Sequence, residues 1–250
     1  MPGFSNIDRG VTIDLSMMNG STFDTETDIA SIQPGGRWKD VYADLEVHGV
    51  TVTGGRDGGV GVGGFLLGGG ISFFSGREGF GCDSIVNYEV VLADGSVVNA
   101  NSEENADLWK ALKGGTSNFG IVTRFDMEAM PSKDMYYNVW FVEAAHSDVV
   151  IDTVSAFTDH EVSTKNDALV TFFSHDTTVS PETYVGMIHV NTQGNANTSH
   201  VLDQVKSLPT LINVSKYQTM AEAAEGSQVE GGSQYVSLSH PVDFLFSSPR

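Results

Sequence analysis

The sequence contains a single cysteine, few basic residues and no long apolar run. Cys82 has no second cysteine to pair with, which excludes a disulfide bond within the chain and a cluster of thiolates around a metal. Lys and Arg number 13 against 32 Asp and Glu, a formal net charge of −19. Such a chain repels nucleic acid and anionic membrane surfaces, so we exclude a nucleic-acid partner and a membrane role. No apolar run reaches the roughly 18 residues that a membrane-spanning helix needs.

The patterns that mark several enzyme classes are also missing. The seven histidines show neither the H-E-x-x-H motif nor another metal-ligand spacing, so no metal site is predicted. There is no G-x-S-x-G motif, and Cys82 has no cationic neighbour in the sequence to lower its pKa. We therefore set metalloenzymes and hydrolases aside. The first ten residues lack the basic end and apolar block of a signal peptide, and the cellular location is left open.

Glycine, in contrast, is abundant and unevenly distributed. Residues 54–81, here called the glycine segment, hold 13 of the 28 glycines and are interrupted by apolar side chains such as Val60 and Leu66. Each glycine carries an entropic cost of about 0.5 to 1 kcal/mol in regular structure. The apolar residues argue against a solvated linker. A buried backbone without side chains suits close contact with a large flat ligand or with another backbone.

One motif match in this segment is misleading. Gly59, Gly61 and Gly64 satisfy the dinucleotide pattern G-x-G-x-x-G, and Asp83 follows about twenty residues later. That pattern must open a helix. The glycines at residues 68–70 would each cost about 1 kcal/mol in a helix, so we expect none here and reject a Rossmann domain.

The periodicity of apolar residues predicts an α+β chain. Asp94 and Gly95 form the expected turn of a hairpin, and Asn105 is the expected N-cap of a helix. A fall in glycine content places a domain boundary at residues 130/131, and the stretch from residue 222 onward is predicted to be loop. Strands are predicted at residues 11–15, 27–33, 50–53, 84–93, 96–100, 120–125, 136–144, 167–175 and 183–190. Helices are predicted at residues 37–46, 105–112, 147–158 and 199–207.

Eight short motifs occur in one order, and together they carry a resemblance. They are SNIDRGVTIDL at 5–15, QPGGRW at 33–38, GGR at 54–56, VGVGG at 60–64, GGG at 68–70, CD at 82–83, LADGS at 92–96 and GGTSNFGIVT at 114–123. In these motifs the chain resembles the FAD-linked oxidases of the vanillyl-alcohol oxidase class, in particular the fungal berberine-bridge-enzyme-like branch. The resemblance is strong over residues 1–130 and holds in general outline beyond them.

The resemblance implies an α+β fold in two parts. Residues 1–130 would form a PCMH-type FAD-binding domain, mainly its second subdomain, and residues 131–250 part of an α+β substrate domain with an antiparallel sheet. The chain would then look truncated at both ends. The implied FAD-binding residues are Pro34, Gly35, Gly54, Gly55, Val60, Gly61, Gly63, Gly64, Gly68, Asp83, Gly120, Ile121 and Val122.

The resemblance also implies a function. An FAD-dependent oxidoreductase would take hydride from a small organic substrate, and O₂ would reoxidise the flavin; a small apolar residue near Val60 is associated in relatives with oxygen access. An acidic chain would hold the phosphates of FAD through backbone amides. Two alternatives stay open: a truncated, inactive copy that does not hold FAD stably, and a cyclase without redox turnover. The catalytic base, the substrate and the oligomeric state are not assigned.

Three positions depart from the resembling family. Asp57 stands where some relatives have a flavin-linking cysteine, Phe65 where many have histidine, and Glu78 where an aromatic residue is usual. The resemblance therefore implies non-covalent FAD in this chain. From the residues alone, Asp57 and Asp83 are expected to cap a helix or to accept hydrogen bonds from backbone N–H groups of their own loops. A role as catalytic acid is the alternative, although no spacing supports it.

Overall fold

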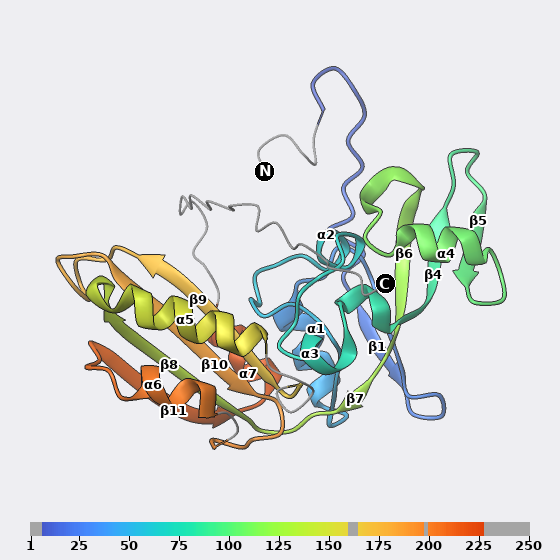
Figure 1. The fold of residues 1–250 in the computed structure, drawn as a ribbon. Helices are drawn as coiled ribbons and strands as arrows, with labels where there is room; N and C mark the ends of the chain where they lie inside the picture. The colour runs from blue at the N-terminus through green and yellow to red at the C-terminus, as the bar shows by residue number, and fades with distance from the viewer. Residues whose placement is uncertain (1–6, 160–164, 198–199, 228–250) are drawn as a thin grey trace, which may run out of the picture.

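Two antiparallel sheets organise the chain, each with its own helices (Figure 1). The computed structural model describes residues 7–159, 165–197 and 200–227. The mixture of helices and antiparallel sheets confirms the predicted α+β class. Within the described residues, no helix has the length and apolar character needed to cross a membrane.

The first sheet has five strands in the order β1-β2-β6-β4-β5. Strand β6 lies in the middle and pairs antiparallel with both β2 and β4. The predicted hairpin is confirmed, because Val91 pairs with Val97 across the turn at residues 94–95. The strands are β1 (Ser21–Asp24), β2 (Ile29–Ile32), β4 (Ile85–Val91), β5 (Val97–Asn101) and β6 (Ile121–Glu128).

The helices of this half form where the periodicity predicts them. Helix α1 (Trp38–Glu46) buries Trp38, Val41, Tyr42 and Leu45, whose spacing of three and four residues places them on one face. After α1, β3 (Val50–Thr51) pairs antiparallel with β7 (Met130–Pro131). The remaining short elements are α2 (Val62–Leu67), α3 (Ser75–Glu78), η1 (Gly81–Ser84), α4 (Ala106–Leu112) and η2 (Thr116–Asn118).

The second sheet has four strands in the order β11-β8-β10-β9. Figure 1 shows α5 and α6 lying along this sheet, and Trp140, Val150 and Met187 belong to the apolar cluster that joins them. The strands are β8 (Met135–Glu143), β9 (Asp167–Ser174), β10 (Tyr184–Asn191) and β11 (Ile212–Gln218). The helices are η3 (Ala144–His146), α5 (Ser147–Thr158), η5 (His200–Leu202), α6 (Asp203–Lys206) and α7 (Met220–Gly226).

The strand predicted at residues 11–15 is wrong. These residues alternate in polarity, yet Val11 is 85% and Ile13 60% exposed and neither belongs to a strand. The first strand is instead β1, which pairs with β2. Alternation indicates a strand only where a neighbouring strand supplies hydrogen bonds, and residues 11–15 pair with no strand among the described residues.

The end of the described chain also differs from the prediction. Residues 222–226, predicted as loop, lie in α7, which begins with a capping box between Thr219 and Glu222. Strand β11 was not predicted, and it completes the second sheet by pairing with β8. The rest of the predicted terminal loop, residues 228–250, lies outside the described residues.

Asn105 stands at the N-cap position of α4, as predicted, but it does not cap the helix with its side chain. It has a φ of +48°, and its side chain makes no cap hydrogen bond. Its Nδ2 instead donates to the carbonyl oxygen of Asn99 at 2.7 Å. The asparagine therefore sets the left-handed turn that leads into α4, a conformation that asparagine tolerates well.

The boundary at residues 130/131 stays a prediction. The two sheets do divide there, since β7 ends at Pro131 and β8 begins at Met135. However, one apolar cluster contains Phe125, Tyr137 and Ala224 together, and the amide of Gly58 donates to the carbonyl oxygen of Ala224 at 3.1 Å. The last described helix thus returns to the first half, and the two halves share a core.

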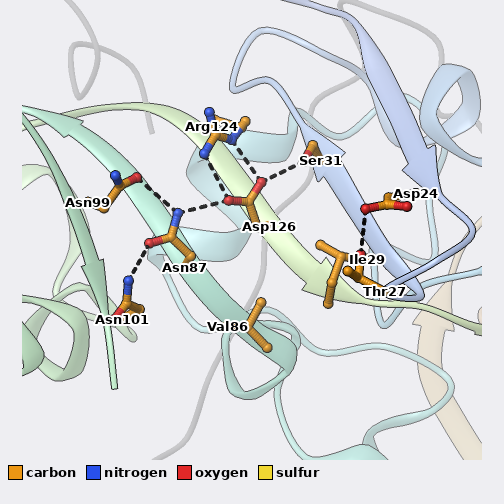
Figure 2. Close-up of a pocket in the computed structure, with 10 residues that line it drawn as sticks. All are labelled: Asp24, Thr27, Ile29, Ser31, Val86, Asn87, Asn99, Asn101, Arg124 and Asp126. Atoms are coloured by element: carbon orange, nitrogen blue, oxygen red, sulfur yellow. Dashed lines mark hydrogen bonds and ion pairs between the residues drawn. The ribbon is translucent and has the colours of Figure 1, made fainter. Parts of the chain in front are cut away.

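A polar network crosses one face of the first sheet (Figure 2). The carboxylate of Asp126 on β6 accepts hydrogen bonds from Ser31 Oγ at 2.6 Å, Asn87 Nδ2 at 2.8 Å and Arg124 Nε at 2.8 Å. Arg124 also pairs with Glu89 at 2.9 Å. Because Ser31 lies on β2 and Asn87 on β4, this one carboxylate joins three neighbouring strands.

Replacing Asp126 with asparagine should lower the free energy of unfolding by about 2 kcal/mol at pH 7. Burial raises the pKa of this carboxyl, but hydrogen bonds from Arg124, Ser31 and Asn87 outweigh it and hold the pKa below the ordinary 3.8. The stabilisation is therefore present above about pH 3.8 and is lost as the pH falls below it. Urea unfolding at pH 7 and pH 3 checks this. If the free energies of unfolding of wild type and Asp126→Asn differed by the same amount at both pH values, the prediction would be contradicted.

Candidate functional site

The glycine segment contains a helix where none was expected. Helix α2 begins after its N-cap residue Gly61 and ends at Gly68. The expected penalty does not arise, because the glycine triplet follows the helix, and Gly69 and Gly70 have φ values of +99° and +83°. The Rossmann domain stays excluded on other grounds, since the preceding strand β3 pairs antiparallel with β7 and is not part of a parallel sheet.

Several glycines of the site are required by the packing of the chain itself. A Cβ atom on Gly54 would lie 2.2 Å from a ring carbon of Trp38, and one on Gly55 would lie 2.4 Å from another. A Cβ on Gly35 would lie 2.0 Å from the carbonyl oxygen of Leu15. Real Cβ atoms do not approach so closely, so these three glycines make room for protein atoms.

Other glycines face open space. A Cβ on Gly64 would meet no atom within 4 Å, and one on Gly61 would meet only Arg37 Nη1, at 3.5 Å. A Cβ on Gly59 would meet only the carboxylate of Asp57, at 3.2 Å. These positions leave bare backbone turned toward empty volume, which is the arrangement that close approach of a ligand requires.

Two cavities lie along this segment, and of these three glycines only Gly64 lines them. The first, here called the Val60 cavity, has about 430 Å³ and is lined by Gly55, Arg56, Asp57, Val60, Gly64, Phe65, Gly68, Gly70 and Ile71. The second, here called the Gly120 cavity, has about 380 Å³ and is lined by Ile13, Leu15, Pro34, Gly63, Gly64, Leu67, Thr116, Ser117, Gly120, Ile121 and Val122. Since both cavities include residues of α2, this short helix forms a wall common to them.

Nine of the thirteen residues that the resemblance implied line these cavities. They are Pro34, Gly55, Val60, Gly63, Gly64, Gly68, Gly120, Ile121 and Val122. The other four, Gly35, Gly54, Gly61 and Asp83, line neither. Gly61 starts α2, and Asp83 accepts a hydrogen bond from the amide of Phe80 at 2.8 Å.

The two flanking acids serve their own loops, as expected from the residues alone. Asp57 Oδ1 accepts a hydrogen bond from the amide of Gly59 at 2.7 Å, and Asp83 does the same for Phe80. Phe65 packs edge-on against Trp38, with ring centroids 5.1 Å apart. Neither Asp57 nor Phe65 presents a sulfur or a ring nitrogen to the Val60 cavity.

The Gly120 cavity includes residues that the sequence reasoning did not assign. Thr116 and Ser117 line it, and Thr116 has a φ of +58° at the start of η2. Both lie in the GGTSNFGIVT motif, and their place in that motif could have marked them as residues of the site. Gly120 has a φ of +147°, and its Cβ would lie 2.7 Å from Val90 Cγ1, so the chain needs glycine before β6.

The reactive side chain nearest in sequence to the glycine segment is inert. Cys82 is buried, and burial together with the neighbouring Asp83 raises the pKa of its thiol. Within the three described ranges, no three His, Cys, Asp or Glu side chains gather in a metal-binding group.

Comparison with known proteins agrees with this geometry. Residues 2–101 match the family described as FAD binding domain. The chain is 41% identical over 175 residues to the FAD-dependent monooxygenase drtC of Aspergillus calidoustus. The aligned segment covers 70% of this chain and 34% of that protein. It thus spans about a third of the length of such relatives.

Two solved structures share the fold. 6-Hydroxy-D-nicotine oxidase from Arthrobacter nicotinovorans superposes with a TM-score of 0.78 at 21% identity, covering 90% of this chain and 50% of that one. Xylooligosaccharide oxidase from Myceliophthora thermophila C1 superposes with a TM-score of 0.72 at 25% identity, covering 88% and 46%.

Proposed function

We propose that this chain, which carries a PCMH-type FAD-binding domain on a fold shared with oxidases of the vanillyl-alcohol oxidase class, works as an FAD-dependent oxidoreductase. Its substrate would be a small organic molecule, and O₂ would be the electron acceptor. The names of the relatives and structural neighbours, which are monooxygenases and oxidases, support this proposal.

The observation that carries the proposal is the bare backbone at Gly64. It is the position of the glycine segment where an added Cβ meets open space and where both cavities meet. A molecule that joins a flat ring to a longer polar chain can use two spaces that lie against the same short helix. FAD has that shape.

The residues present fit FAD in their chemistry. Gly55, Val60 and Gly64 would hold the flat ring, because they offer backbone and one small apolar side chain. Pro34 and Gly120 would hold the rest of the molecule in the Gly120 cavity. FAD supplies a hydride acceptor that O₂ can reoxidise. Val60, 40% exposed, contributes a small apolar side chain to the wall of its cavity.

The visible spectrum of the purified chain tests the proposal. After incubation with FAD and gel filtration, flavin absorption bands near one FAD per chain are expected. Peroxide release is then measured on a panel of alcohols, sugars and phenols. A colourless protein that added FAD does not restore would contradict the proposal for this chain.

Flavin in this chain should be released by acid denaturation. Asp57 stands where some relatives carry a flavin-linking cysteine, and Phe65 where many carry histidine. Neither has a nucleophilic sulfur or ring nitrogen, and Asp57 is engaged by the amide of Gly59. Precipitation with trichloroacetic acid should therefore leave the yellow colour in the supernatant. Colour that stays with the pellet would overturn the prediction of non-covalent binding.

A further inference from the structure

Arg56 occupies an unusual position between the two halves of the fold. It lines the Val60 cavity, is only partly exposed, and holds its guanidinium carbon 5.9 Å from the ring centre of Phe73. The ring of Tyr137, on β8 of the second sheet, packs edge-on against the same Phe73 with centroids 5.9 Å apart. Phe73 thus brings together one cation from the glycine segment and one hydroxyl from the second sheet.

Arg56 has no acidic partner in the described part of the chain. The two other arginines that are not exposed, Arg77 and Arg124, pair with Glu78 and Glu89. No hydrogen bond or ion pair joins the guanidinium of Arg56 to any described residue, although the chain has 32 acidic residues. A guanidinium that has lost part of its hydration is stabilised by an anion that accepts its N–H groups.

The surroundings of Arg56 agree with an anion site. Burial lowers the pKa of Arg56, and the nearby Tyr137 partly offsets this. The Tyr137 hydroxyl makes no hydrogen bond to the residues that the structure describes, and only 7% of this residue is exposed. Tyr137 lies on β8, where its register partner on β11 is the exposed Lys216. The guanidinium of Arg56, which lines the Val60 cavity, and the hydroxyl of the nearby Tyr137 are therefore two potential donors to an anion.

We propose that Arg56 and Tyr137 bind an anionic group of the substrate, a carboxylate or a phenolate, at the edge of the Val60 cavity. The inference rests on the proposed function and narrows its substrate class. The phosphates of FAD are the other source of an anion. The placement favours the substrate, since Arg56 faces Tyr137 of the second sheet and does not line the Gly120 cavity. With a net charge of −19 on the chain, a local cation is needed to admit such a substrate.

Binding of a matched pair of probes tests the proposal. Isothermal titration measures the Kd of 4-hydroxybenzoate and of neutral 4-hydroxybenzamide, with the FAD-loaded chain and with the chain without added FAD. Wild type should bind the benzoate at least tenfold more tightly. Arg56→Met should abolish this preference, Tyr137→Phe should reduce it, and Arg56→Lys should retain part of it. Arg9→Met, at an exposed position, makes the same change in net charge and should leave the preference intact.

The outcomes separate this proposal from the proposed function. If wild type shows no preference, or if Arg56→Met keeps it, the anion site is wrong whether or not FAD binds. If Arg56→Met instead weakens the binding of ADP and FAD, the anion is a flavin phosphate and the proposal is overturned. A colourless wild type would contradict the proposed function alone, because the titration without FAD still reports on Arg56. Melting temperatures confirm that each variant is folded.

Discussion

Replacing Gly64 with leucine should abolish the flavin spectrum and leave the melting temperature unchanged. The new side chain meets no protein atom within 4 Å at its Cβ, so the fold accommodates it. It would nevertheless project from the residue that lines both cavities and reduce the volume available to FAD. Loss of ring contact with the wall should weaken FAD binding on the order of 100-fold, or about 2.8 kcal/mol. Titration of the purified variant with FAD, followed by flavin fluorescence, measures the change.

Gly226→Leu is the matched control for this variant. Gly226, at the end of α7, also has no atom within 4 Å of an added Cβ, but it lines neither cavity. FAD affinity should therefore equal that of wild type. If Gly64→Leu binds FAD as tightly as the control does, the proposed cofactor site is in the wrong place.

Gly54→Ala should have the opposite effect and destabilise the fold. The added methyl would lie 2.2 Å from the Trp38 ring and 2.6 Å from the hydroxyl of Tyr42, and all three groups are buried. Overpacking of this kind costs about 3 kcal/mol, which corresponds to a fall in melting temperature of about 10 °C in a chain of this size. Thermal unfolding followed by circular dichroism measures it.

Gly61→Ala is the control for this second variant. It lies in the same segment, and its Cβ would be at an ordinary contact distance of 3.5 Å from Arg37. Its melting temperature should stay within about 2 °C of wild type, as for most substitutions that create no clash. Equal destabilisation by Gly54→Ala and Gly61→Ala would show that the Trp38 contact does not set the need for glycine.

Together these variants would divide the glycine segment into two groups. Gly54 and Gly55 leave room for Trp38, and Gly58 leaves room for the carbonyl oxygen of Ala224 on α7. Gly64 leaves room for no protein atom. High glycine content here therefore has two separate causes, tight packing of the chain and access to the cavities.

Local periodicity was sufficient for most of the secondary structure. The apolar spacing of α1 and of α5, and the turn of the β4–β5 hairpin, are properties of short stretches of sequence, and all three were predicted. The failures have a common physical reason. Residues 11–15 alternate but have no neighbouring strand, and β11 becomes a strand because β8 is available to pair with it. Pairing between distant segments is not visible in a local pattern.

For the candidate site, too, local sequence predicted part of the arrangement and contacts between distant residues decided the rest. The ordered motifs alone determined that this is an α+β chain resembling FAD-linked oxidases, and they located nine of the residues that line the two cavities. In the sequence, a glycine that leaves room for a ligand cannot be distinguished from one that leaves room for a tryptophan. Only the tertiary structure decided that Trp38 requires Gly54 while Gly64 stays open, and that Arg56 meets Tyr137 without an acidic partner among the described residues. These facts depend on contacts between residues far apart in the sequence, which only the folded chain brings together.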